Sequence, residues 1–345
     1  MTDASADTRY VRQSILPEIG ARGQARLAEA HVVIVGCGAL GSLQAELLAR
    51  AGVGRLTVLD RDFVERSNLQ RQVLFTDRDA ELGLPKALAA ERALRAINPE
   101  IRIDGIVEDL NPGTASALLG GADVVADGTD NFETRYLVND WSIREGVPWV
   151  YAGVIGTAGL VMPVLPGETA CLRCLFETVP APGSLPTCET AGVLGAAVAV
   201  VAGQQNAEIL KLLTGARDRV SRALLRIDVW ETAWTSVTTG PPRPDCPVCG
   251  ERSYEWLEGR RGGRAARLCG RRAIQLLPGE GASPPRLPEL AGRLRPEWEV
   301  TLNEHLLRAR RGDRTVSVFR DGRAIVEGTA DETEARSLVA RVVGA

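Results

Sequence analysis

Histidine is scarce in this 345-residue chain, and so are long apolar runs. His31 and His305 are the only histidines, and they form no catalytic constellation with other residues. The most apolar run, residues 191–203, is too short to span a bilayer and is more typical of a buried helix. The first residues, MTDASADTRY, lack the apolar core of a signal peptide. We therefore expect a cytoplasmic protein that does not bind membranes.

A large excess of one charge is also lacking. The 41 basic and 44 acidic residues leave a net charge of −3. This balance gives no electrostatic basis for binding nucleic acid or an acidic membrane surface. The length exceeds what one hydrophobic core usually carries, so we expect one large α/β domain and a smaller second one.

Four of the seven cysteines stand in two C-x-x-C pairs, Cys171 with Cys174 and Cys246 with Cys249. Two such pairs supply four thiolates in the tetrahedral arrangement of a structural Zn²⁺ site. Because sulfur takes all four positions, this zinc would hold the chain together and not catalyse. Redox pairs and an iron–sulfur cluster are the weaker alternatives. Paired cysteines of this kind suit a reducing cytoplasm better than a secreted disulfide framework.

A glycine-rich turn connects a predicted strand to a predicted helix. The apolar run at residues 32–35 ends at GCGALG (36–41), a helical pattern follows, and a second apolar run at 56–59 ends at Asp60. Glycines in such a turn let backbone N–H groups approach phosphates at the positive end of the helix. Asp60 is placed to hold ribose hydroxyls. The pattern predicts a nucleotide-binding fold but does not say which nucleotide binds.

The polar stretch SNLQRQ (67–72) follows the second strand at the carboxyl edge of the predicted sheet, where open α/β sheets bind ligands. Lys86 then opens a helix through about residue 97, with Pro85 suited to the first turn of that helix. Any single Lys or Arg is usually a solvated charge. Arg71 and Lys86 on two successive loops of one crevice favour a phosphate clamp instead.

A further acid follows another buried strand. Residues 123–127 form this strand, and Asp130 comes directly after its end, where a carboxylate can hold Mg²⁺ against phosphates. The alternative is that Asp130 caps the helix that begins at residue 132. Residues 149–153 and 159–164 predict one more strand and an antiparallel extension, and residues 224–230 a final strand.

Cys188 belongs to neither cysteine pair. It lies just after the loop-like segment 180–186 and before a predicted helix at residues 191–213. The positive end of that helix can lower a thiol pKa, which would suit a nucleophile or a sulfur relay. The alternative is a small, partly buried residue without a chemical role.

The character of the sequence changes at Glu251. We expect residues 251–272, which are rich in arginine and contain glycines, to form a linker, with a basic docking patch as the alternative. Residues 273–345 predict a small α+β domain of unknown role. Its elements are a strand at 273–277, a helix at 287–294, a hairpin around Asp321-Gly322 and a closing helix at about 333–343.

Taken together, the motifs resemble the E1-like adenylyltransferase superfamily, in particular the enzymes that activate ubiquitin-like sulfur carriers for molybdopterin, thiamine and related pathways. The resemblance covers residues 9–250, the expected ATP-binding domain being 1–250. The motifs, in order, are RYVRQ (9–13), GCGALG (36–41), LDRD (59–62), SNLQRQ (67–72), GLPKA (83–87), DGTDN (127–131), CLRC (171–174), TCETAGVLG (187–195) and CPVC (246–249). The resemblance implies a Rossmann-like, doubly wound, mostly parallel sheet with an antiparallel extension and zinc knuckles.

The resemblance also implies roles for single residues. Arg71, Lys86, Asp130 and Arg12 correspond to catalytic residues, Arg12 to one that crosses a homodimer interface into the partner's ATP site. Cys188 corresponds to a cysteine that takes part in acyl or persulfide transfer in some relatives only. The expected contacts to ATP and Mg²⁺ are Gly36, Gly38, Ala39, Gly41, Asp60, Ser67, Asn68, Leu69, Gln70, Arg71, Lys86, Asp130 and Asn131, and the expected zinc ligands are Cys171, Cys174, Cys246 and Cys249.

The implied reaction is attack by the C-terminal glycine carboxylate of a small ubiquitin-like protein, ending in Gly-Gly, on the α-phosphate of ATP. This chemistry needs charge neutralisation and alignment but no protein nucleophile. Cys37 and Ala39 depart from many relatives, and the C-terminal domain is not the rhodanese module that some relatives carry, so sulfur would come from elsewhere.

Three alternatives to this function remain. An E1-like enzyme that activates a peptide or another protein, in a conjugation or natural-product pathway, shares the same core motifs. A non-catalytic subunit of a heterodimeric E1 would be expected to lose the phosphate clamp, which is intact here. An NAD-dependent oxidoreductase shares the glycine turn and Asp60 but does not require Arg71, Lys86 and Asp130.

Overall fold

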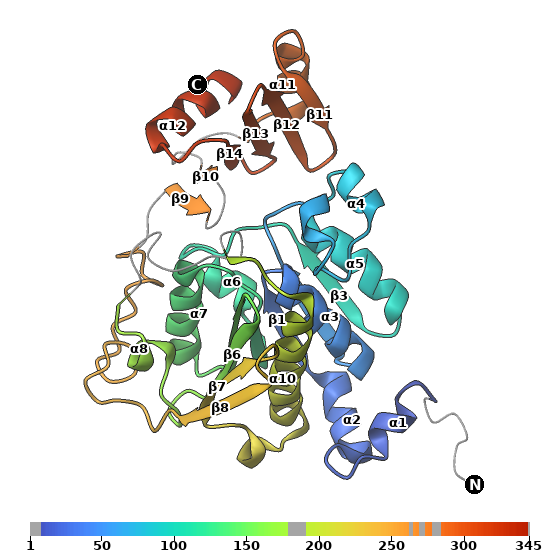
Figure 1. Ribbon diagram of the computed structural model, residues 1–345, viewed down its shortest axis with the longest axis vertical. Helices are drawn as coiled ribbons and strands as arrows, with labels where there is room; N and C mark the ends of the chain where they lie inside the picture. The colour runs from blue at the N-terminus through green and yellow to red at the C-terminus, as the bar shows by residue number, and fades with distance from the viewer. Residues whose placement is uncertain (1–7, 179–190, 262–264, 269–272, 278–283, 344–345) are drawn as a thin grey trace. The chain divides into compact units, whose positions relative to one another are not determined.

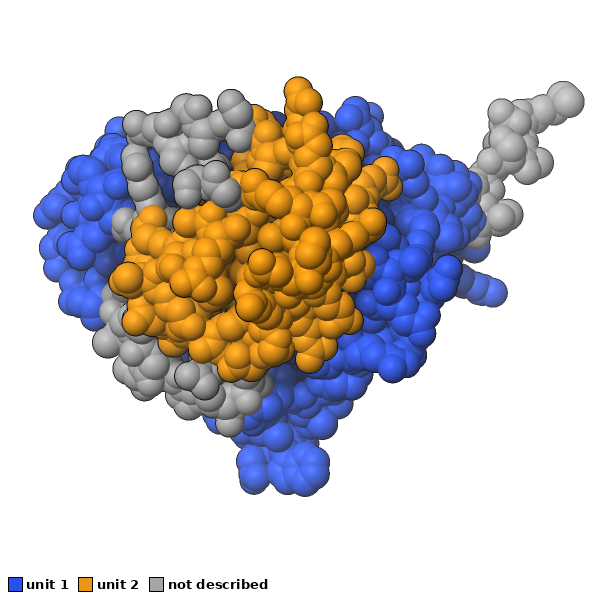
Figure 2. Space-filling view, turned by 90° about the horizontal axis from the view of Figure 1, so that it is seen from above, with its two compact units in different colours: residues 1–261 blue, residues 262–345 orange. Residues whose placement is uncertain are grey.

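The computed structural model describes residues 8–178, 191–261, 265–268, 273–277 and 284–343. The chain separates into two compact units, residues 1–261 (the N-terminal unit) and residues 262–345 (the C-terminal unit), which Figure 2 shows in different colours. Within the described residues, no helix is both long and apolar enough to cross a membrane.

The N-terminal unit is built on an eight-stranded sheet with the order β3-β2-β1-β4-β5-β6-β7-β8. The first five strands pair in parallel and the last three in antiparallel fashion. The strands are β1 (His31–Val35), β2 (Arg55–Leu59), β3 (Arg102–Ile106), β4 (Val124–Asp127), β5 (Trp149–Ile155), β6 (Ala158–Val164), β7 (Ala223–Asp228) and β8 (Ala233–Thr238). The predicted doubly wound sheet with its antiparallel extension is confirmed.

Helices cover both faces of this sheet, as Figure 1 shows. Alternate residues of β1 point to opposite faces: Val32 and Ile34 join one hydrophobic core, and Val33 and Val35 join another. The first core is closed by α2 (Gly20–Glu29), α3 (Ala39–Ala51), α5 (Lys86–Ile97) and α10 (Gly195–Thr214), and the second by α6 (Ala115–Leu119), α7 (Phe132–Glu145) and α8 (Leu172–Leu175).

The strand order reverses at β1. This strand pairs with β2 on one side and β4 on the other, with Val32 opposite Leu56 and Val124. The connections from β1 and β4 lead to opposite faces of the sheet, and open α/β sheets bind ligands in the crevice beyond the carboxyl ends of such strands. The glycine turn and the Asp130 loop both lie at this point.

The prediction that residues 224–230 form the last strand of the unit is wrong. Strand β7 ends at Asp228, and the edge strand β8 follows it. The sequence of β8, AWTSVT, is almost wholly exposed, so it carries no buried face that a pattern of apolar residues would reveal. The remaining short elements of the unit are η1 (Thr8–Tyr10), α1 (Val11–Ser14), η2 (Arg66–Asn68), α4 (Asp77–Glu81) and η3 (Arg217–Arg219).

The C-terminal unit is an antiparallel sheet with helices packed on it. Its strand order is β11-β12-β13-β14-β10-β9, and the predicted hairpin around Asp321-Gly322 is β13–β14. The elements are β9 (Ala265–Leu268), β10 (Ala273–Leu276), α11 (Leu287–Leu294), β11 (Glu299–Leu302), β12 (Leu306–Arg311), β13 (Arg314–Phe319), β14 (Ala324–Glu327) and α12 (Glu332–Val343). Strand β9 lies within the segment interpreted as a linker, and β11 and β12 were not predicted.

Candidate nucleotide site and metal centre

Three glycines bring the turn after β1 against the loop after β4. Gly36 has a φ of +87°, which only glycine adopts at little cost. A Cβ on Gly41 would lie 1.8 Å from the Gly36 carbonyl oxygen, and one on Gly128 would lie 2.3 Å from the same atom. The backbone of the glycine turn therefore touches the loop that carries Asp130. Gly128 was not among the predicted site residues, although it stands within the DGTDN motif.

Asp60 closes the glycine turn. Its carboxylate accepts a hydrogen bond from the Cys37 N–H at 2.6 Å and another from the Asp62 N–H at 2.7 Å. Burial raises the pKa of Asp60, while nearby Lys86 lowers it. The Cys37 side chain itself is fully buried, and its pKa is raised by burial and by Asp60, so this cysteine is a core residue and not a reactive thiol.

Lys86 is the first residue of α5, and Pro85 is the residue that precedes the helix, one position earlier than predicted. The Lys86 side chain is 6% exposed, and its Nζ lies 3.3 Å from an oxygen of Asp62. The Lys86 N–H also donates to the Asp62 carbonyl at 2.9 Å. The structure therefore gives the predicted phosphate lysine a carboxylate partner that the sequence analysis missed. The only signal for Asp62 was its place two residues after Asp60.

The SNLQRQ loop turns polar side chains toward the glycine turn. Asn68 and Gln72 are at least nine-tenths buried, yet Asn68 Oδ1 and Gln72 Oε1 have no hydrogen-bond partner among the described residues. Gln72 Nε2 lies 3.8 Å from the position that a Cβ on Gly38 would occupy. Unpaired buried polar atoms are rare in folded proteins, so they fit a site that binds a polar ligand.

The other members of this loop differ in their surroundings. Arg71 donates from Nη1 to the Ser67 carbonyl at 3.0 Å, and the Ser67 hydroxyl donates to Glu65 at 3.3 Å. Leu69 packs against the hydrophobic core, so its contribution to a ligand site is limited to its backbone. Gln70 is exposed.

Asp130 is exposed, and it is not the residue that caps α7. Asn131 caps that helix, because its Oδ1 accepts a hydrogen bond from the Thr134 N–H at 2.8 Å. Burial lowers the pKa of Arg61, but Asp109, Asp62 and Asp130 together raise it above its ordinary value. Asp130 thus lies near enough to Arg61 to interact with it electrostatically, and its exposed carboxylate is the type of ligand that Mg²⁺ prefers.

Arg12 does not join the site of its own chain. It is exposed on α1, which is attached to the far end of α3 through the Gln13 side chain, 2.8 Å from the Ala51 carbonyl oxygen. At 1.5 Å per residue, the 13 residues of α3 put about 20 Å between that end and the glycine turn. Val11, Ile15 and Leu16 around Arg12 are also exposed, by 47% or more.

The four cysteines of the two pairs come together. Their sulfurs all lie within 4.8 Å of one another, at 3.9 Å between Cys171 and Cys174 and 3.6 Å between Cys174 and Cys249. A Zn²⁺ ion with Zn–S bonds of about 2.3 Å sets tetrahedral sulfurs roughly 3.8 Å apart. A disulfide would need about 2.05 Å. The donor set and its spacing therefore fit zinc.

Helix α7 links this metal centre to the nucleotide crevice. Asn139 accepts the Leu172 N–H at 2.8 Å and donates toward the Cys171 sulfur at 3.7 Å. Asp140 accepts the Trp256 N–H at 2.9 Å beyond the second cysteine pair. The same helix begins beside Asp130. Cys188 lies outside the described residues.

A model of the ThiF family matches residues 10–248 of the chain. The chain belongs to the ThiF family. Over 338 residues this ThiF-family chain is 41% identical to the sulfur carrier protein ThiS adenylyltransferase of Bacillus subtilis, an alignment that covers 97% of this chain and 99% of that protein. It is 44% identical over 248 residues to the sulfur carrier protein adenylyltransferase of Thermus thermophilus, covering 70% of this chain and 90% of that one.

The crystal structure of E. coli MccB with MccA-N7isoASN is also similar. It superposes with a TM-score of 0.63 at 26% identity and covers 71% of this chain and 75% of MccB. These findings confirm the predicted E1-like adenylyltransferase membership and the predicted fold. The B. subtilis relative matches nearly the whole ThiF-family chain, so the match includes the C-terminal unit, whereas the T. thermophilus relative matches 70% of it.

Proposed function

We propose that this ThiF-family protein adenylates the C-terminal glycine carboxylate of a small ubiquitin-like sulfur carrier that ends in Gly-Gly. The observation that carries the proposal is the near full-length match to a relative named as a ThiS adenylyltransferase. In the reaction, a carboxylate oxygen attacks the α-phosphorus of ATP. The bond from that phosphorus to the bridging oxygen breaks, and pyrophosphate leaves with the bonding electrons.

The chain's own residues hold the phosphates in this proposal. Lys86, fixed by Asp62, and Arg71, which would exchange the Ser67 carbonyl for phosphate, neutralise the charge that develops on the leaving group. The backbone of the glycine turn approaches the phosphates, and Asp60 binds the ribose. The unpaired oxygens of Asn68 and Gln72 accept from polar groups of the ligand.

Asp130 would hold Mg²⁺, which when bound neutralises phosphate charge and aligns the reactants. The exposed carboxylate at the carboxyl end of β4 supports this assignment. The Asn131 side-chain oxygen caps α7, so Asn131 fixes the loop, and its contact with the nucleotide stays a prediction.

A homodimer would complete the site. Because Arg12 is attached about 20 Å from the glycine turn of its own chain, it serves catalysis only across an interface between two copies. The exposed apolar side chains of Val11 in α1 and of Ile15 and Leu16 directly after it support such an interface. The zinc at Cys171, Cys174, Cys246 and Cys249 is structural in this proposal. The role of Cys188 as a nucleophile or sulfur relay stays a prediction. The cytoplasmic location also stays a prediction.

Activation of a peptide or of another protein is the second candidate. The similarity to the MccB structure, which contains MccA-N7isoASN, favours it. The identity to MccB is 26%, against 41% to the ThiS adenylyltransferase over nearly the whole chain. The sulfur-carrier assignment is therefore the better supported one.

ATP–pyrophosphate exchange with each small Gly-Gly-terminated protein of the source organism tests the proposal. We expect exchange with one such protein, and its loss in Asp130→Ala. Glu133→Gln, three residues further along the chain at an exposed position in the first turn of α7 and without a proposed role, serves as the matched control and should retain exchange. Folded, zinc-loaded protein that binds ATP but exchanges with no carrier would refute the sulfur-carrier assignment.

A further inference from the structure

A buried ion pair lies directly beneath the Asp130 loop. Asp127, the last residue of β4, and Arg135, in the first turns of α7, have side chains 2% and 9% exposed, with Arg135 Nε 3.5 Å from Asp127 Oδ2. None of the proposed roles in ATP binding uses this pair. Charges are seldom buried so completely unless the structure gives them several partners.

Both members of the pair hold Thr129, the residue before Asp130. Asp127 Oδ1 accepts from the Thr129 N–H at 2.8 Å and from the Thr129 hydroxyl at 2.7 Å. Arg135 Nη2 donates to the Thr129 carbonyl at 2.8 Å. That carbonyl belongs to the peptide group that joins Thr129 to Asp130. Three hydrogen bonds with one ion pair therefore hold Thr129, two at its backbone and one at its hydroxyl, and with it the backbone from which the Asp130 side chain projects.

The arginine is itself held in place on several sides. Its guanidinium lies 5.4 Å from the centroid of the Phe132 ring and 5.2 Å from that of Tyr151, and Nη2 also donates to the Ala152 carbonyl at 3.2 Å. A Cβ on Gly153 would lie only 3.3 Å from Nη2. Arg135 thus has little room to move, as a group that orients another must.

The end of β4 is secured from the opposite face of the sheet as well. Strands β4 and β5 pair at only two positions, Val125 with Trp149 and Ala126 with Val150. Beyond them, the Asp127 carbonyl accepts from Gln44 Nε2 at 2.9 Å and from Gln205 Nε2 at 3.0 Å. Beyond the paired positions of β4 and β5, side-chain hydrogen bonds hold the end of β4. The segment 127–129 is therefore fixed on both faces of the sheet.

We propose that Asp127 and Arg135 are positioning residues, which hold the Thr129–Asp130 peptide so that the Asp130 carboxylate meets the cation bound with ATP. The inference rests on the proposed function, in which Asp130 holds Mg²⁺. Neither residue touches the nucleotide in this account. Loss of the pair lowers the affinity of the protein for the cation that binds with ATP. It does not change the affinity for ATP when the cation is absent.

Calorimetric titration of the full-length protein with ATP tests this, once in EDTA and once in excess Mg²⁺. The quantity of interest is the factor by which Mg²⁺ strengthens ATP binding. Arg135→Lys keeps the charge but loses the donor geometry at the Thr129 and Ala152 carbonyls, and Thr129→Val removes one hydrogen bond to Asp127 without changing the residue's size. Arg144→Lys, an exposed arginine of the same helix, is the matched control.

We expect Arg135→Lys to reduce the Mg²⁺ factor on the order of tenfold, as loss of a group that orients a metal ligand commonly does. Thr129→Val should reduce it less, and Arg144→Lys not at all. ATP affinity in EDTA should stay within about twofold of wild type, because the glycine turn is untouched. The Mg²⁺ concentration for half-maximal exchange should rise in the same order of variants.

An unchanged Mg²⁺ factor in folded Arg135→Lys and Thr129→Val would overturn the inference. Should Arg135→Lys lose its cooperative melting transition, Thr129→Val decides alone. Asp130→Ala distinguishes a failure of the magnesium role of Asp130 from a failure of the positioning role of Asp127 and Arg135. If this variant keeps the wild-type Mg²⁺ factor, the proposed magnesium role of Asp130 fails, and the positioning role with it. If Asp130→Ala loses the factor while the other variants keep it, only the positioning role is refuted.

Discussion

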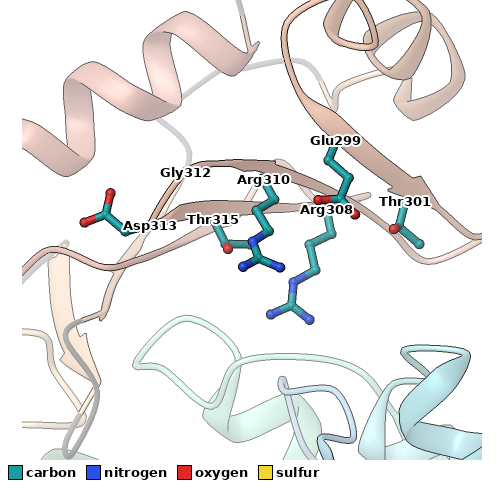
Figure 3. A pocket seen from close by; sticks show the side chains of 7 residues that line it. All are labelled: Glu299, Thr301, Arg308, Arg310, Gly312, Asp313 and Thr315. Carbon is teal, nitrogen blue, oxygen red and sulfur yellow. The ribbon is translucent and has the colours of Figure 1, made fainter.

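Two clusters of polar side chains, one in each unit, lie in contrasting surroundings. In the N-terminal unit, Lys86, Asp127 and Arg135 are nearly buried and converge at the carboxyl ends of a parallel sheet. In the C-terminal unit, a hollow of about 360 Å³ lies on the open face of an antiparallel sheet. Figure 3 shows Arg308 and Arg310 extending from the same face of that sheet. The residues that line it are Glu299, Thr301, Arg308, Arg310, Gly312, Asp313 and Thr315.

The difference follows from strand connectivity. Where strand order reverses in a parallel sheet, loops leave toward both faces, and the polar groups at the strand ends are enclosed by neighbouring loops and helices. An antiparallel strand instead alternates a buried and a solvated face, so polar side chains such as Arg310 remain exposed. Enclosure fixes side chains against chosen partners, and exposure does not. We therefore assign chemistry to the first region and none to the second.

Loss of the zinc should have the largest effect, and it should be confined to the N-terminal unit. Binding of a structural zinc contributes roughly 10 kcal/mol or more in small domains. We expect one Zn²⁺ per chain by elemental analysis, and loss of metal and of cooperative folding in Cys246→Ser. Hydrogen exchange followed by mass spectrometry should show peptides of α7 losing protection while those of β12 and β13 keep theirs. A Cys246→Ser protein with unchanged metal content would contradict the four-cysteine site.

Lys86→Met should lower ATP–pyrophosphate exchange by about a thousandfold, because a positioned cation beside the leaving phosphates is removed. Arg310→Met is the matched control in the C-terminal unit, and its exchange rate should equal that of wild type. Steady-state exchange kinetics at saturating ATP measure both. Comparable losses of exchange in Lys86→Met and Arg310→Met would contradict the assignment of chemistry to the enclosed basic residue and not to the exposed one.

Arg12→Ala should lower exchange by about a hundredfold, since its guanidinium is one of several cations at the site. Mixing Arg12→Ala with Lys86→Met provides the sharper measurement. Each mixed dimer has one site with both side chains intact, so random exchange of subunits should restore about one quarter of wild-type activity. If mixing restores nothing although size-exclusion chromatography with light scattering shows mixed dimers, Arg12 does not act across an interface.

Asp140 in the N-terminal unit and Glu334 in the C-terminal unit should contribute to the stability of their units with opposite pH dependence. Burial raises the pKa of Asp140 to about 7, so the unfolded N-terminal unit releases this proton at lower pH than the folded one. The contribution of Asp140 to the free energy of unfolding of that unit should fall between about pH 4 and pH 7, by at most about 1.4 kcal/mol per pH unit. Asp140→Asn should remove this slope.

In the C-terminal unit, hydrogen bonds from Thr329 and Arg314 lower the pKa of the partly exposed Glu334. Its contribution to stability is therefore present above the ordinary glutamate pKa and is lost as the pH falls through the lowered value. Hydrogen exchange at several pH values measures peptides of both units at once. A pH dependence of the N-terminal unit that Asp140→Asn leaves unchanged would contradict the assignment to Asp140.

Local patterns made much of the first region predictable. The apolar runs around GCGALG, the acid at Asp60 and the helix from Lys86 to Ile97 all follow from residues close together in the chain. Strands β8, β11 and β12 are not marked as clearly. Most residues of β8 are exposed, so this strand shows no buried face. Strand β11 (EVTL) alternates polar and apolar residues but is only four residues long, and β12 (LLRARR) ends in exposed arginines without a regular alternation.

The sequence by itself determined the nucleotide fold, the two cysteine pairs and the family, because these depend on residue type and short spacing. Only the tertiary structure decided which polar groups meet. Asp62 faces Lys86 across 24 residues, Gln205 reaches the end of β4 across 78, and Arg12 is kept away from the glycine turn of its own chain by the length of α3. Such contacts depend on how strands and helices pack, and no local pattern encodes them.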